Sequence, residues 1–219
     1  MRAIFTCIAL VAFLISGCDT TVNNKVKEND TIAKDTLSEK DAIKKTLQED
    51  LPPPTDIKQF NWFYSAFAYA AIAGNDTLFD VVIHPMYGLW IIHSEGAVPN
   101  FTHVTHIMEY KKANGKSLLP FDRDPMISVP KEGTLPVVDC ESKNLYNKKG
   151  CFTSLQNSFK EQKIWKNAGL SADKDRAIEA SAVTITRTVI NTENYRFYFS
   201  LIDGSWYLTF MDIMRPCEA

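Results

Sequence analysis

The sequence predicts an α+β domain in which a long aromatic helix packs on a mostly antiparallel sheet that ends in a C-terminal meander. Three observations predict it. Apolar residues follow helical periodicity over 55–76. Turn-forming Gly and Pro residues are frequent over 95–150, which predicts irregular structure with short strands. Three segments rich in β-branched and aromatic residues close the chain, at 183–190, 194–202 and 205–213.

The helix has recognisable ends and an unusually apolar surface. Thr55 or Asp56 is a suitable N-cap, and Gly74 is a suitable end. The periodic apolar positions are Phe60, Phe63, Tyr64, Phe67 and Ala71. Because Trp62 and Tyr69 add aromatic rings on other sides, the helix is apolar almost all round. We therefore expect it to be covered on more than one side.

Shorter elements are expected between the helix and the meander. A second helical turn is predicted within 75–84, where Pro85 stops it. The stretch GLWIIHS (88–94) is typical of a strand. Residues 153–170 favour a helix that ends at Gly169.

The last two strands form a hairpin whose register can be predicted. Asp203-Gly204 between them is typical of a type I′ turn. Such a turn pairs Ile202 with Ser205, Leu201 with Trp206, Phe199 with Leu208, and Phe197 with Phe210. The three apolar pairs then share one face of the sheet. The other face receives Arg196, Tyr198, Ser200, Tyr207 and Thr209.

The layout of the folded part, with its ending YRFYFSLIDGSWYLTFMDI, resembles the NTF2-like (cystatin-like) domains. That resemblance implies a cone, in which the helix lies in a strongly curved sheet. It rests on layout and carries no fingerprint residue. The alternative is a generic α+β domain with the helix packed flat on one sheet.

The N-terminus is typical of an exported protein. Residues 1–17 carry one charge, Arg2, before an apolar run that is too short to span a bilayer comfortably. The run ends in Ile15-Ser16-Gly17-Cys18, which resembles the lipobox of bacterial lipoproteins. The resemblance implies that Cys18 is acylated and becomes the mature N-terminus. The alternative is an ordinary secretory signal whose Cys joins a disulfide.

Residues 18–54 are expected to form a polar tether, because they contain no aromatic residue and few large aliphatic ones. Three triplets in it, DTT, DTI and DTL, resemble the Asp-Ser/Thr-apolar signal for periplasmic O-glycosylation in one large group of bacteria. The resemblance makes Thr20, Thr31 and Thr36 candidate glycosylation sites. The alternative is a polar linker rich in Asp and Thr. The remaining chain, 55–219, is expected to be a single domain.

Five cysteines are present, of which Cys7 and Cys18 belong to the signal and the lipobox. Outside the cytoplasm, a disulfide between Cys140 and Cys151 is expected, because the intervening segment is polar and loop-like. The alternatives pair Cys217 with one of these two.

The four histidines fall in one window of the sequence, at positions 84–106. The sequence lacks HExxH, and no acidic residue stands at a usual metal-ligand spacing from His103 and His106, so we expect no metal. One interpretation is a pocket at the open end of the cone. Its candidate residues are Tyr87, Trp90, His93, His103 and His106. The alternative places these histidines on loops and at strand ends, hydrogen-bonded or solvated.

Charge and motif content limit the function. The formal net charge of −2 becomes −3 when the signal with Arg2 is removed, so nucleic acid is not an expected partner. We find no motif for phosphate binding, for a nucleophilic serine or for a cofactor. The leading hypothesis is a lipid-anchored, periplasmic or surface-facing protein of the bacterial envelope that binds a small ligand or another envelope protein. The alternatives are a pocket enzyme, a hydrolase or lyase that uses His93, His103 or His106 with or without a metal, and an interaction domain without a pocket.

Overall fold

The computed structural model describes residues 55–217, apart from 95, 97 and 194. The expected signal peptide, the acylated Cys18, and the tether with its candidate Thr residues therefore lie outside the described residues. The described part contains no helix that is both long and apolar enough to cross a bilayer.

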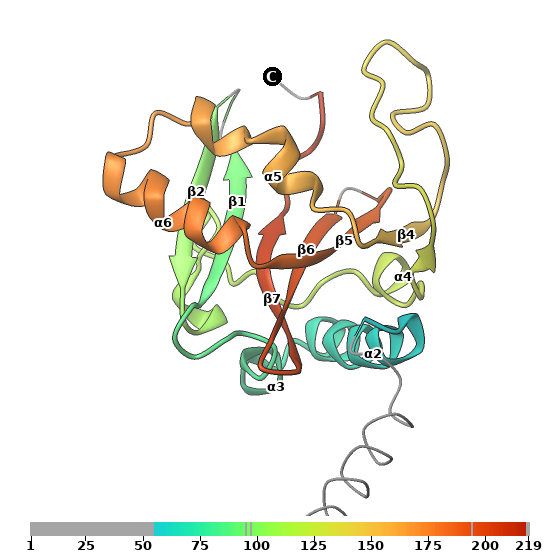
Figure 1. The fold of residues 1–219 in the computed structure, drawn as a ribbon, viewed down its shortest axis with the longest axis horizontal. Coiled ribbons are helices and arrows are strands. Elements are labelled where there is room, and N and C mark those ends of the chain that lie inside the picture. Colours follow the sequence, from blue (N-terminus) through green and yellow to red (C-terminus); the bar gives the residue numbers. More distant parts are fainter. Residues whose placement is uncertain (1–54, 95, 97, 194, 218–219) are drawn as a thin grey trace, which may run out of the picture. The chain divides into compact units, whose positions relative to one another are not determined.

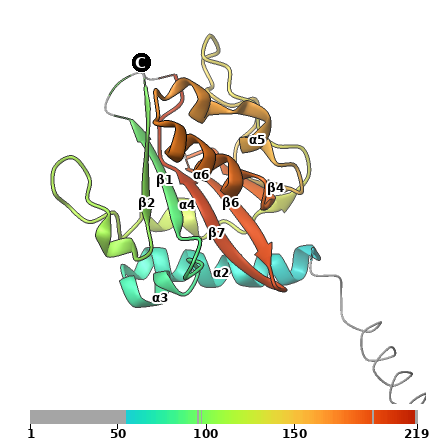
Figure 2. The same cartoon turned by 60° about the vertical axis from the view of Figure 1, so that its left-hand side comes forward.

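The described chain is an open sheet with helices on both faces (Figures 1 and 2). Its strands lie in the order β2-β1-β7-β6-β5-β4-β3. They are β1 Leu89–Ser94, β2 Pro99–Val104, β3 Lys131–Glu132, β4 Cys151–Ser154, β5 Ile185–Asn191, β6 Tyr195–Ile202 and β7 Ser205–Asp212. The β1–β7 and β3–β4 pairs are parallel and the others are antiparallel. The α+β class is confirmed, whereas an NTF2-like cone is not.

Helix α2 (Ile57–Ala73) packs its aromatic face on the central strands. Asp56 caps it by accepting a hydrogen bond from Lys58 N, and Gly74 ends it in the left-handed conformation. The Phe60 and Phe199 ring centroids are 5.2 Å apart, edge to face. Further buried residues of this core are Tyr64, Phe67, Ala71, Phe197, Leu208 and Met211.

The opposite side of α2 is not covered in the way that the sequence suggested. Trp62 is 76% exposed and Tyr69 is 67% exposed. Large apolar side chains in such exposed positions are unusual on a helix whose other face forms the core. Part of the apolar surface of α2, which the sequence led us to expect to be covered, is therefore exposed.

The predicted hairpin forms, with one correction to its register. Asp203 and Gly204 both have positive φ, as a type I′ turn requires. The pairs Ile202–Ser205, Leu201–Trp206 and Phe199–Leu208 are confirmed. A β-bulge follows, in which Thr209 is the extra residue, so Phe197 pairs with Met211 rather than with Phe210. Phe210 therefore lies on the other face of the sheet, in a second core.

That second core is covered by helices α5 (Ser158–Gln162) and α6 (Ala172–Ala182), with the short 3-10 helix η2 (Ile164–Asn167) between them. The single helix expected over 153–170 is wrong. Its first residues belong to β4, and Lys163 adopts φ 49°, which ends α5. The Phe159 and Trp165 rings then stack with centroids 4.9 Å apart over the sheet. Helix α6 was not anticipated.

Shorter elements connect these layers. They are α3 (Asp76–Asp80), the 3-10 helix η1 (Ile107–Glu109) and α4 (Arg123–Met126). The positions of α3 and β1 agree with the second helical turn and the strand that the sequence predicted.

Arg187 on β5 has a completely buried side chain, which contacts two other parts of the chain. Nη1 lies 2.9 Å from Glu132 Oε1 of β3, and Nη2 donates a hydrogen bond of 2.8 Å to Thr55 O at the start of α2. The guanidinium also lies 5.0 Å from the Phe60 ring centroid. A buried charge needs such partners, because an unpaired one is strongly destabilising.

The expected Cys140–Cys151 disulfide is wrong. Cys140 is bonded to Cys217, and Cys151 is a free, buried thiol. Cys151 begins β4 with its side chain in the core, where its Sγ lies 3.7 Å from Tyr64 Oη. Cys140 and Cys217 are instead exposed and close together. With 77 residues of separation, the chain-entropy model gives this bond a stabilisation of about 4.5 kcal/mol.

The three cysteines should differ in reactivity. Burial raises the pKa of the Cys151 thiol to about 11, so thiolate is scarce at neutral pH. We expect iodoacetamide to leave Cys151 unmodified in the native, non-reduced protein and to modify it fully in guanidinium chloride. Peptide mapping by mass spectrometry should find the Cys140–Cys217 link. Rapid native alkylation of Cys151, or a link that contains it, would contradict this arrangement.

Candidate functional site

The five residues of the expected histidine pocket do not form one site. The strand register places Trp90 opposite His103, and their ring centroids are 4.6 Å apart. Trp90 is buried in the second core and donates a hydrogen bond to Ser181 Oγ on α6. His103 is held by a 2.8 Å hydrogen bond to Tyr87 O. This group therefore lies on the α6 face of the sheet.

His93 lies on the opposite face. Side chains alternate along β1, so Ile92 enters the second core while Ile91 and His93 point toward the α2 side. There the His93 ring contacts Thr102 Oγ1 at 3.1 Å and lies 5.4 Å from the Tyr110 ring centroid. The sheet thus separates His93 from His103, and the two cannot act on one ligand.

His106 lies apart from both, where its Nδ1 is 2.9 Å from Asp80 Oδ2 of α3, within hydrogen-bond distance. His84 uses its Nδ1 to accept hydrogen bonds from the backbone N–H groups of Met86 and Tyr87. Within 55–217, outside its three gaps, no group of three or more His, Cys, Asp or Glu residues is arranged to hold a metal ion. The interpretation of these histidines as a shared pocket is wrong, because each makes a separate structural contact.

The packing at His103 makes Gly88 a sensitive position. Gly88 has φ 63°, and a Cβ there would clash with the His103 ring and lie 2.6 Å from Val104 O. We expect Gly88→Ala to lower the free energy of unfolding by about 2–4 kcal/mol, from the left-handed backbone and the clash together. Urea denaturation measures this change.

Gly115→Ala is the matched control for that measurement. Gly115 has φ 77°, and a Cβ there meets no atom within 4 Å. We therefore expect Gly115→Ala to lower the free energy of unfolding by about 1–2 kcal/mol, through the left-handed backbone conformation alone. Equal losses in the two variants would show that the contact with His103 and Val104 is unimportant.

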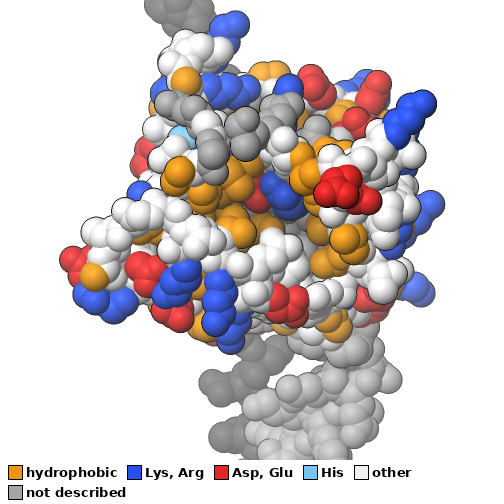
Figure 3. All heavy atoms as spheres, turned by 90° about the horizontal axis from the view of Figure 1, so that it is seen from above, with side chains coloured by type: hydrophobic (Ala, Val, Ile, Leu, Met, Phe, Trp, Pro, Cys, Tyr) orange, Lys and Arg blue, Asp and Glu red, His pale blue; other side chains and the backbone are white. Residues whose placement is uncertain are grey.

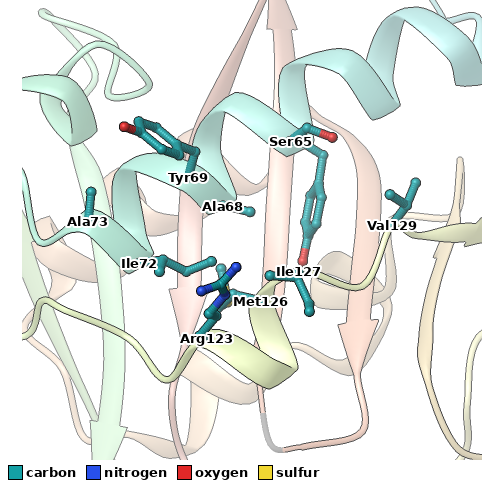
Figure 4. Close-up of a pocket in the computed structure, with 10 residues that line it drawn as sticks. Ser65, Ala68, Tyr69, Ile72, Ala73, Arg123, Met126, Ile127 and Val129 are labelled. Carbon is teal, nitrogen blue, oxygen red and sulfur yellow. The ribbon is translucent and has the colours of Figure 1, made fainter.

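A groove of about 400 Å³ lies between the outer side of α2 and the α4 segment (Figure 4). Helix α2 supplies one wall, and the chain from Arg123 to Val129 supplies the other. Its lining residues are Tyr64, Ser65, Ala68, Tyr69, Ile72, Ala73, Arg123, Met126, Ile127 and Val129. Most are apolar, and Tyr69, Ile127 and Val129 are each more than half exposed. The groove is therefore an open apolar surface.

Hydrogen bonds and packing hold the second wall in place. Phe121 N donates to Ala71 O at 3.0 Å, which joins the start of this segment to α2. Asn191 Nδ2 donates to Pro125 O and joins its middle to β5. Met126 is fully buried beneath the wall. The groove is thus a built feature of the domain.

Arg123 is the one charged residue among the ten that line the groove. Figure 4 shows its guanidinium between Ile72 and Ile127, directed toward α2. No hydrogen bond or ion pair to this guanidinium is formed by the residues that the structure describes. Its donors, set in an apolar surface, suit a carboxylate, which arginine binds through two parallel hydrogen bonds.

The sequence did not single out this groove. Its one signal was the apolar outer side of α2, which we interpreted as a second packing surface. Arg123 lies in an irregular segment, where neither periodicity nor a motif marks a residue. Comparisons with protein-family models, with curated proteins and with solved structures each returned no match for this chain.

Proposed function

We propose that this protein is a non-catalytic binding module held at the bacterial envelope by a lipid on Cys18, and that its α2–α4 groove binds an apolar ligand carrying a carboxylate. The observation that carries the proposal is the Arg123 guanidinium, which has no partner among the described residues and lies in an open groove whose other lining residues are uncharged. The apolar walls bury the body of the ligand, and Arg123 binds its acidic end.

The anchoring part of the proposal rests on the lipobox-like Ile15-Ser16-Gly17-Cys18 after a short apolar run. A lipid there would keep the domain close to a membrane, where apolar carboxylates such as fatty acids concentrate. The net charge of −3 expected after signal removal supports lipid rather than a basic surface as the means of attachment.

Ligand binding can be tested with decanoate and decanol, which share an apolar chain and differ at the polar end. By isothermal titration we expect decanoate to bind about tenfold more tightly, since a hydrogen bond to a charged group contributes about 1.5–3 kcal/mol. Arg123→Gln should abolish that preference and leave decanol binding unchanged. Arg176→Gln, which alters an exposed arginine on α6, is the control.

A blocking variant tests the place of binding. Ser65 is exposed and lines the groove, so Ser65→Trp should weaken both ligands at least tenfold. Ala66 is its exposed neighbour on α2 and does not line the groove, so Ala66→Trp should bind as the parent does. Unchanged binding in Ser65→Trp would refute the groove as the site.

Anchoring is tested separately in the bacterium. We expect an alkynyl palmitate fed to cells to label the parent chain and to leave Cys18→Ser unlabelled, because that substitution removes the acylated sulfur. Cys7→Ser, which alters the other cysteine of residues 1–18, should remain labelled. In-gel fluorescence measures the label. Label retained by Cys18→Ser would reject lipidation at this residue.

A further inference from the structure

A second hollow, of about 470 Å³, lies between the 133–150 loop and helix α5. Figure 3 shows the domain from the side on which this loop lies, with hydrophobic side chains around a hollow and a basic side chain within it. Leu135 and Pro136 of the loop, Gln162 of α5 and Ile190 of β5 line it, together with Tyr146 and Arg196. None of these residues lines the α2–α4 groove.

The basic residue that lines this hollow is Arg196 on β6, whose side chain is 14% exposed. Nε lies 2.8 Å from Asp212 Oδ2 on the neighbouring strand. Nη2 donates a 3.1 Å hydrogen bond to Met214 O. The Nη1 amino group forms no hydrogen bond with the residues that the structure describes. Arg196 therefore lines the hollow with N–H donors on Nη1 that form no hydrogen bond with the described residues.

Tyr146 supplies a second unused polar group. The residue is 5% exposed, and its hydroxyl is buried without a hydrogen-bond partner among the described residues. A buried polar group left unpaired costs about 1–3 kcal/mol, and most such groups in proteins are paired. The loop itself sets this position, because a β-bridge pairs Val138 with Tyr146.

The charged residues at this hollow indicate which kind of molecule can bind there. The positive charge of Arg196 is compensated by Asp212, which is 1% exposed. Glu161 on α5 adds a negative charge to the lining. An anion would meet this uncompensated carboxylate, whereas an uncharged carbonyl oxygen can accept hydrogen bonds from Arg196 and Tyr146 without that repulsion.

The Cys140–Cys217 disulfide holds one wall of the hollow. Cys140 follows the lining residue Val138 by two positions, and Cys217 follows Met214, whose carbonyl binds Arg196, by three. The bond therefore joins the loop to the segment that positions Arg196. Breaking it leaves this loop attached to the sheet through the main chain at its two ends only, without the cross-link to the segment after β7.

We propose that this hollow is a second binding site, which takes an uncharged, apolar molecule with a carbonyl acceptor and depends on the Cys140–Cys217 disulfide. The proposal is independent of the α2–α4 groove and of lipid attachment. Arg196 and Tyr146 donate to the carbonyl, and the loop and α5 enclose the apolar body.

Nile red is a suitable probe, because it is uncharged, apolar and carries a ring carbonyl. Its fluorescence should be titrated in the Ser65→Trp background, in which the α2–α4 groove is obstructed. We expect Gln162→Trp, which fills the hollow, to weaken binding at least tenfold. Lys160→Trp is the control, since Lys160 is exposed on the same helix and does not line the hollow.

Two further variants test the polar group and the wall. Tyr146→Phe removes only the hydroxyl and should weaken Nile red about fivefold without lowering the melting temperature. Cys140→Ser should also weaken binding, at temperatures where circular dichroism shows the fold intact. Equal binding in the Gln162→Trp and Lys160→Trp variants would overturn the site. Tighter binding of the anionic dye 8-anilinonaphthalene-1-sulfonate than of Nile red would overturn the assignment of an uncharged ligand.

Discussion

Edge-to-face packing of aromatic rings between α2 and the last hairpin is the contact on which the other features depend. Phe60 meets Phe199 at 5.2 Å, and Phe67 meets Phe197 at 5.0 Å between ring centroids. Each such pair contributes about 0.5–1.5 kcal/mol beyond the burial of its surface. Because these rings determine which side of α2 faces the sheet, they also determine that Tyr69 faces outward, where it lines the groove.

Arg187 adds a hydrogen-bonded constraint to this aromatic packing. The rings determine which side of α2 faces the sheet, and the guanidinium bonded to both Thr55 O and Glu132 fixes the segment that begins the helix. Replacing buried ion pairs with apolar residues is often tolerated, but removing one partner leaves a buried charge. Glu132 and Arg187 therefore act as a unit, and loss of either one should disturb α2 and β3 together.

The sequence predicted the parts of the fold that local chemistry decides. Asp203-Gly204 specified a turn, and the alternation of apolar residues next to it specified the register as far as Leu208. Beyond that point a single extra residue, Thr209, moved Phe210 to the other face, and no local pattern marks such a bulge. Helix α6 escaped notice because most of its residues are polar and only Ile178 and Ala182 are buried.

The site was harder to predict than the fold for a related reason. Nearness in sequence suggested both the Cys140–Cys151 bond and a histidine pocket, yet three cysteines allow three pairings and a sheet separates residues that alternate along a strand. The groove depends on contacts between distant segments, such as Phe121 with Ala71 and Asn191 with Pro125. Such contacts leave no periodicity or spacing in the chain that could identify Arg123 in advance.

The strand order also has a consequence for synthesis of the chain. The last two strands of the described chain, β6 and β7, occupy the middle of the sheet, and β7 joins β1 to the rest. A nascent chain that ends before β7 thus leaves β1 and β2 separated from β3, β4 and β5, with unpaired strand edges on both sides. Long-range pairing of this kind is slow and exposes apolar surface until it is complete. The two parts of the sheet can therefore join only after synthesis has passed β7.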